Sequence, residues 1–222
     1  FPDFITMSTA TDHAYDLIRK KIRDGQLLAG ARLVESRLVD VCQVSRTPVR
    51  EALRRLSHDG LVDLIPNSGA VVAKWSDEEI IDLYGVRARI EAMAASLAAE
   101  RRSDGDIDRL MALALRMKQL SDHRSSDATL NELAILNNDF HHQILIASKS
   151  RAVEAAASQI NETPLMLRTF QKYDSEGLRR SAREHLDLVR AIEARDGEWA
   201  GAIMRAHIMA GLDVLKRSRL NP

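Results

Sequence analysis

The sequence predicts a mainly α-helical protein, with an N-terminal winged helix-turn-helix whose wing is a small β-hairpin and a C-terminal all-α helical bundle. The composition is typical of helical proteins, with 45% hydrophobic, 29% charged and only 4% aromatic residues. Near the N-terminus, two short helical patterns separated by a three-residue break are followed by two short strand patterns. Beyond these strands the patterns are helical to the end of the chain.

The first predicted domain covers residues 7–75, and Met7 is the expected natural start after an added or upstream extension. A helix is expected over Thr9–Asp24. Its apolar residues recur at spacings of three and four, at Tyr15, Ile18 and Ile22. The stretch LLAGARL that follows predicts a turn.

Two short helices and a hairpin complete this domain. The first helix is expected over Glu35–Cys42, and after the break QVS a second helix runs through VSRTPVREALRRLSHDG. Its inward-facing residues are predicted to be Val49, Leu53 and Leu56. Beyond Gly60, the stretches LVDLIP and AVVAKW predict two strands joined by the turn NSG.

The second predicted domain covers residues 76–222 and is all helical. Ser76 and Glu79 form a capping-box pattern, which opens a helix through IIDLYGVRARIEAMAASLAAERR. Further helices are expected over residues 105–121, 127–148, 151–171, 177–195 and 198–218. They predict a bundle of about six helices.

Charge and cysteine content exclude several classes of protein. Lys plus Arg equals Asp plus Glu at 32 each, so any charge that binds nucleic acid must be local. Cys42 is the single cysteine, which excludes a disulfide within the chain and favours a reducing cytoplasm. No apolar run approaches the roughly 20 residues of a membrane span, so we expect a cytoplasmic protein with no membrane partner.

The second short helix carries a local basic stripe. Arg46, Arg50 and Arg54 recur every four residues, which indicates either a solvated helix face or a surface for DNA. A recognition helix enters the major groove with its N-terminal residues, where Arg46 and Arg50 can each bond a guanine. Ser45 and Thr47 can cap the helix or bond phosphate.

The stretch VSRTPVREALRRLSHDGLV, followed by NSGAVV, resembles the DNA-binding signature of the GntR superfamily. The resemblance implies that Arg46 and Arg50 contact bases and that Ser45 and Thr47 contact the DNA backbone. It also implies that the wing tip, formed by Asn67, Ser68 and Gly69, lies at the minor groove. Arg32 and Arg37 are expected near phosphates. A structural helix pair, as is common in enzymes, is the other interpretation.

Polar residues on three helices of the second domain are predicted to converge. Asn137 and His141 share an apolar helix face, and His185 and His207 lie in register with apolar residues of two later helices. Each histidine alone is compatible with a hydrogen-bonded core residue. Because buried imidazoles need partners, the three together fit a bound cation as well as they fit a hydrogen-bonded core, and both interpretations stay open at this point.

The motifs YGVRARIEAMAASLAA, LNNDFHHQI, EHLDLVRAI and HIMAG resemble the FCD-type C-terminal ligand-binding domain of the FadR subfamily, in its metal-containing branch. The resemblance implies a divalent metal ion, zinc or nickel, on Asn137, His141, His185 and His207. Four neutral ligands would leave the cation its full charge, which favours a small carboxylate or sugar-acid effector. Arg87 is expected either to pair with Glu91 or to reach the effector carboxylate.

The predicted function is that of a ligand-responsive, DNA-binding repressor, and not of an enzyme. We expect a homodimer on an operator with half-sites about 34 Å apart. A regulator that senses the metal without an organic effector is one alternative. A His-ligated metalloenzyme is another, although Asp139 faces away from Asn137 and no general base is evident.

Overall fold

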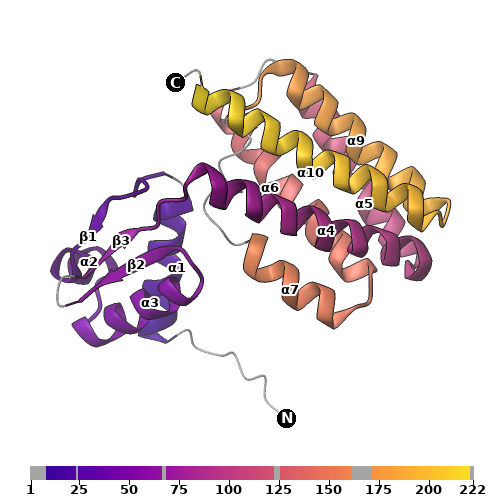
Figure 1. The fold of residues 1–222 in the computed structure, drawn as a ribbon. Helices are drawn as coiled ribbons and strands as arrows, with labels where there is room; N and C mark the ends of the chain where they lie inside the picture. Colours follow the sequence, from indigo (N-terminus) through magenta and orange to yellow (C-terminus); the bar gives the residue numbers. More distant parts are fainter. Residues whose placement is uncertain (1–8, 24, 67–68, 123–125, 162–171, 221–222) are drawn as a thin grey trace, which may run out of the picture. The chain divides into compact units, whose positions relative to one another are not determined.

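The computed structural model describes residues 9–23, 25–66, 69–122, 126–161 and 172–220 of the chain (Figure 1). These residues form two compact units, with the boundary between Trp75 and Ser76. Each unit has its own helices and its own core.

Three helices form most of the N-terminal unit: α1 (Ala10–Arg23), α2 (Glu35–Cys42) and α3 (Arg46–His58). Gln43 ends α2 in the left-handed conformation, with φ of 54°, and Ser45 occupies the N-cap position of α3. The tight turn between α2 and α3 is therefore the expected helix-turn-helix.

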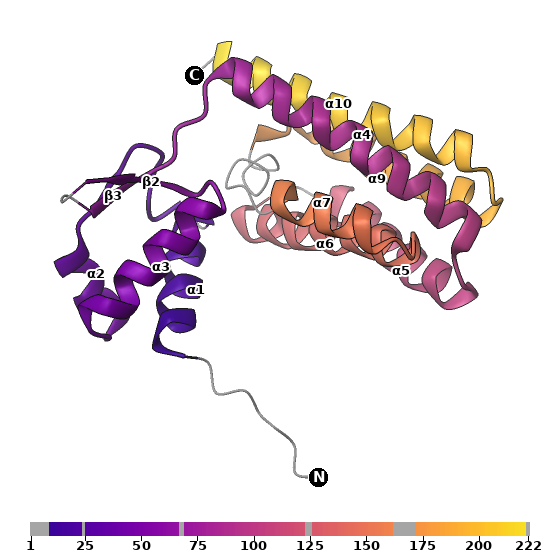
Figure 2. The same ribbon diagram turned by 60° about the horizontal axis from the view of Figure 1, so that its bottom comes forward.

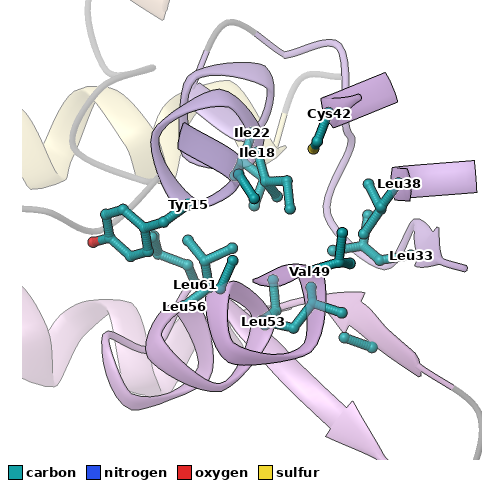
Figure 3. Packing of buried hydrophobic residues seen from close by; sticks show 14 of the residues in the cluster. Tyr15, Ile18, Ile22, Leu33, Leu38, Cys42, Val49, Leu53, Leu56 and Leu61 are labelled. Carbon is teal, nitrogen blue, oxygen red and sulfur yellow. The ribbon is translucent and has the colours of Figure 1, made fainter. Parts of the chain in front are cut away.

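The core of this unit lies between its three helices and the residues of the strands that pack against them (Figure 3). The predicted apolar stripe of α1 is buried, as are the three predicted inward-facing residues of α3. Figure 3 labels the larger members of this core, which are Tyr15, Ile18, Ile22, Leu33, Leu38, Cys42, Val49, Leu53, Leu56 and Leu61.

A three-stranded antiparallel sheet completes the unit, with strand order β1, β3, β2. Strands β2 (Val62–Ile65) and β3 (Gly69–Val72) are the expected hairpin, whereas β1 (Arg32–Leu33) was predicted as a turn. Gly69, with φ of +90°, permits the close approach of β1, because a Cβ there would lie 2.4 Å from the carbonyl oxygen of Leu33.

The C-terminal unit is a helical bundle, as predicted. Ser76 caps its first helix: the Ser76 Oγ accepts from the Glu79 amide at 3.2 Å, and the Glu79 carboxylate accepts from the Ser76 amide at 2.7 Å. The helices among the described residues are α4 (Asp77–Arg101), α5 (Asp104–Ser121), α6 (Asp127–Ala147), α7 (Arg151–Asn161), α9 (Ser175–Glu193) and α10 (Gly197–Leu220). The remainder of the helix expected over 151–171 lies outside the described residues.

Helices α4 and α10 run side by side in both views and make the most extensive helix contact of the unit (Figures 1 and 2). Helix α9 packs against α5 and α10, and α6 packs against α4 and α5. This arrangement brings one face of α6, α9 and α10 into the interior of the bundle. Among the described residues, none of the helices has both the length and the apolar character required to cross a membrane.

Candidate functional site

A groove of about 860 Å³ lies on the N-terminal unit, between the start of α3 and the sheet. Charged side chains from three elements line it together with the edge of the hairpin. The charged residues are Arg32, Glu35, Arg46, Arg50 and Arg54, and Gly69 lines the groove at the hairpin. The groove therefore contains both arginines predicted to contact bases and one predicted to lie near phosphate.

The start of α3 presents polar groups to solvent. Ser45, Arg46 and Thr47 are all exposed, and the Ser45 side chain makes no capping hydrogen bond. Hydroxyl groups and free amides at a helix N-terminus are well suited to phosphate. Arg37 is exposed on α2 but does not line the groove, and the predicted wing residues Asn67 and Ser68 lie outside the described residues.

Arg50 forms an ion pair that the sequence pattern did not indicate. Its Nε donates to a carboxylate oxygen of Glu35 at 2.8 Å, while 58% of the Arg50 side chain stays exposed. Because this bond uses the Nε edge of the guanidinium, the two terminal nitrogens remain for a base. Glu35 thus orients a residue that is expected to contact DNA.

The C-terminal unit brings His141 of α6, His185 of α9 and His207 of α10 together, as predicted. Each of the three is buried, and their ligand nitrogens lie within 4.8 Å of one another. The ring centroids of His185 and His207 are 4.5 Å apart, and those of His141 and His207 are 5.3 Å apart. Neutral imidazole nitrogens so close together are the donor set that zinc, nickel or copper prefers.

Several nitrogens of this histidine cluster lack partners in the described part of the chain. The Nε2 of His141 and both ring nitrogens of His185 are buried without a hydrogen bond. An unsatisfied buried polar atom costs about 1–3 kcal/mol, and several in one place fit a bound cation better than a purely structural core. The residues present therefore fit a metal ion.

Burial also keeps two of these rings neutral, which is the form that binds a metal. It lowers the pKa of His185 well below its ordinary value, and the rings of His207 and His141 act in the same direction. Burial likewise lowers the pKa of His141, although the nearby carboxylate of Glu91 opposes this shift. Neutral rings offer a lone pair without first releasing a proton.

Two of the three histidine rings form a hydrogen bond with a glutamate carboxylate, and the sequence pattern did not indicate either of these contacts. The Nδ1 of His141 bonds a carboxylate oxygen of Glu91, and the Nδ1 of His207 bonds Glu184 at 2.8 Å. The Arg87 Nε donates to the other oxygen of Glu91 at 2.6 Å, so the expected salt bridge is present. Burial raises the pKa of Glu91, but Arg87 and His141 more than offset it and hold the carboxylate ionised.

Asn137 is buried on α6, one helical turn before His141. This position agrees with the shared face expected from the sequence, but no contact between the amide and the histidine cluster is defined. Its part in binding a metal stays a prediction, as does a contact between Arg87 and an effector. Asp139 and His142 on the same helix are exposed.

Arg46, Arg50 and Arg54 form an exposed arginine face on α3, which lines the groove of this winged helix. Such a face is typical of DNA-binding proteins of the helix-turn-helix class. Comparison with known proteins gives the family. Residues 10–72 match the bacterial regulatory proteins of the gntR family, and residues 82–210, more than half of the chain, match the FCD domain. The chain belongs to the GntR family of bacterial transcription regulators, in the group with an FCD domain.

Curated relatives span nearly the same length. The Nta operon transcriptional regulator of Aminobacter aminovorans is 29% identical over 184 residues, which cover 83% of this chain and 84% of the relative. The HTH-type transcriptional repressor GlaR of Escherichia coli (strain K12) is 26% identical over 225 residues, covering 96% and 98%. These relatives are regulators, and this chain is a transcription regulator rather than an enzyme.

Among solved structures, E. coli McbR/YncC shares the fold. It has a TM-score of 0.79 and 22% sequence identity, and the match covers 96% of this chain and all of that one. At this level of identity the likeness concerns the fold alone. It confirms the predicted fold class of a winged helix joined to an all-helical unit.

Proposed function

We propose that this regulator is a repressor that binds operator DNA as a homodimer and responds to a small carboxylate or sugar acid at a metal centre in its helical unit. The observation that carries this proposal is the buried cluster of three histidines with unsatisfied nitrogens. Relatives named as repressors, GlaR and a probable D-xylose utilization operon repressor of Paenarthrobacter nicotinovorans, support the direction of control.

On DNA, the first turn of α3 enters the major groove of each half-site. Arg46 and Arg50 donate to base edges, while Ser45, Thr47 and Arg32 bond the phosphate backbone. Arg37 and the hairpin tip, with Asn67, Ser68 and Gly69, are assigned as further contacts on the strength of the resemblance. Two copies related by a two-fold axis match half-sites about 34 Å apart.

In the helical unit, His141, His185 and His207 hold a divalent cation, zinc or nickel, with Asn137 as a fourth ligand. The bound cation would supply a positive anchor for an anionic ligand. Four neutral ligands leave its charge uncompensated, and this favours a carboxylate over a neutral metabolite. Affinity for the operator changes only if the acid binds the two conformations of the regulator unequally.

A second candidate function is that of a regulator for which the metal itself is the signal. The same three histidines favour it, because they fit a cation without requiring an organic ligand. Under this alternative, operator affinity would respond to zinc or to a chelator when no acid is present.

The proposed contacts of α3 with DNA are tested on DNA duplexes that the full-length protein selects from a randomised pool. Arg50→Ala is expected to cost about 1–3 kcal/mol of binding to the selected duplex and to relax specificity at one base pair of each half-site. Arg205→Ala, an exposed arginine on α10, is the matched control and should leave binding unchanged. Equal loss in both variants, or none in Arg50→Ala, would remove α3 as the recognition helix.

A further inference from the structure

We propose that Glu91 and Glu184 are positioning residues of the metal centre. Each fixes the ring of one histidine by accepting the proton on Nδ1, so that the Nε2 lone pair of that ring is directed to the cation. The inference rests on the proposed metal centre, and it adds two residues that do not touch the metal themselves.

Each of the two carboxylates lies between an arginine of its own helix and a histidine of another helix, with a hydrogen bond to the arginine in the first case and an ion pair alone in the second. In the first chain, Arg87 and Glu91 are four residues apart on α4, and Glu91 bonds His141 of α6. In the second, Arg180 and Glu184 are four residues apart on α9, with Nε and Oε1 separated by 3.4 Å, and Glu184 bonds His207 of α10. Each chain runs from arginine through glutamate to the Nδ1 of a histidine.

Hydrogen-bond chemistry fixes the tautomer in both chains. An ionised carboxylate can only accept, so the Nδ1 that faces it must carry the proton. A neutral imidazole has one N–H, and its lone pair is therefore on Nε2. For His141, that Nε2 is the buried atom without a partner in the described chain, as a metal ligand requires.

His185 differs from the other two rings. Neither of its nitrogens has a hydrogen-bond partner among the described residues, and no carboxylate fixes its tautomer. Its orientation follows from packing, because its ring centroid lies 4.6 Å from that of Phe140 and 4.5 Å from that of His207. Two rings are thus fixed before a metal arrives, and the third completes the site.

The two arginines, Arg87 and Arg180, balance the negative charges of Glu91 and Glu184. Each glutamate is paired with its own arginine, so both chains orient a ring without adding net negative charge beside the cation. Direct carboxylate ligands would instead neutralise the metal. The positioning chains therefore preserve the attraction for an anionic effector that the proposed function requires.

Glu184 offers the cleaner test of the two. Glu91 is buried and contacts both Arg87 and His141, so removing its carboxylate would break two buried polar contacts and destabilise the fold. Glu184 is 24% exposed, and its arginine partner is 37% exposed. Glu184→Ala removes the acceptor, whereas Glu184→Gln keeps an acceptor oxygen.

The first readout needs no metal. Two-bond proton–nitrogen NMR correlations of the metal-free, full-length protein should show His141 and His207 with the proton on Nδ1, the minor tautomer of free histidine. In Glu184→Ala, His207 should become a mixture of tautomers while His141 keeps its proton on Nδ1. A proton on Nε2 of both rings in the wild-type protein would overturn the proposal.

The second readout is zinc affinity, measured by competition with a chelator. Glu184→Ala should bind zinc about 10- to 100-fold more weakly than the wild type, with Glu184→Gln between them. The control is Glu176→Ala on the same helix, where the carboxylate pairs with Arg179 and Arg183 and should not affect zinc. Thermal unfolding of the metal-free variants verifies that they are equally folded.

The outcomes separate the two proposals. If the wild-type protein does not bind zinc or nickel, the metal centre itself is wrong, whatever the tautomers are. If the wild type binds zinc and Glu184→Ala binds it equally well, the metal centre stands and the positioning role of Glu184 is wrong.

Discussion

Asp12, at the start of α1, shows how a single exposed carboxylate stabilises the N-terminal unit. One of its oxygens accepts from the Thr9 hydroxyl at 2.7 Å and from the Thr9 amide, and the other accepts from Arg55 of α3 at 2.6 Å. These bonds lower the pKa of Asp12 from 3.8 to about 2, with the Thr9 hydroxyl as the largest cause. Asp12 therefore stabilises the fold through its ionised form.

This carboxyl gives a prediction for pH dependence. Because its pKa is lower in the folded than in the unfolded chain, its contribution is fully present above about pH 4 and is lost as the pH falls toward about 2. A carbon-13 NMR titration should give about 2 for the wild type and a higher pKa in Thr9→Val, which lacks the hydroxyl donor. A wild-type pKa of 3.8 or above would contradict the hydrogen-bond account.

At the same scale, the sequence predicted the histidines of the site but not the glutamate carboxylates that bond to their rings. His141, His185 and His207 could be predicted because helical spacing puts each on an apolar face. Glu91 and Glu184 could not, because an Arg–Glu pair four residues apart has the pattern of an ordinary surface salt bridge. Only the packing of α4 against α6, and of α9 against α10, brings these carboxylates to Nδ1 atoms.

At the scale of elements, the close contact of α4 and α10 depends on small residues. Ser96 of α4 donates from Oγ to the carbonyl oxygen of Gly197 at 2.7 Å. A Cβ added at Gly201 would lie 2.5 Å from the Ser96 Oγ and 3.2 Å from the Ala92 carbonyl oxygen. This contact holds together the helices that carry Glu91 and His207.

Gly201→Ala should therefore lower the free energy of unfolding by about 1–3 kcal/mol, because the new methyl group would push the Ser96 hydroxyl and the Ala92 carbonyl of α4 away from α10. Gly105→Ala is the matched control, since a Cβ at that position of α5 would meet nothing within 4 Å. It should be neutral or stabilising by up to about 1 kcal/mol, as expected for alanine in an exposed helix. Chemical denaturation measures both, and an equal effect in the two variants would contradict the packing of α4 on α10.

The elements themselves were largely predictable from sequence, and the exception is instructive. Helix α2 was expected with its observed ends, because Gln43 and Ser45 lie in a break that both neighbouring helix patterns define. Strand β1 was missed, because two residues are too short to show alternation. Its pairing with β3 depends on a contact between Leu33 and Ala70, distant in sequence.

At the scale of the whole molecule, a chain with no net charge carries an arginine face on one unit and a buried histidine cluster in the other. The local charge supplies DNA affinity where the total charge cannot. In the proposed function, a metal ion on the histidine cluster would bind the anionic effector. In the proposed function a coupling free energy links effector binding to operator binding, and such coupling typically changes affinity by about 5- to 150-fold.

The most direct test measures the affinity of the zinc-loaded, full-length protein for its selected duplex across a panel of small carboxylates and sugar acids. One acid should change the affinity of the wild type by about five-fold or more. His185→Ala should show no such change, whereas His142→Ala, which replaces an exposed histidine of α6, should respond like the wild type. An acid response that persists in His185→Ala, or operator affinity that follows zinc alone and no acid, would contradict sensing of an acid at the metal centre.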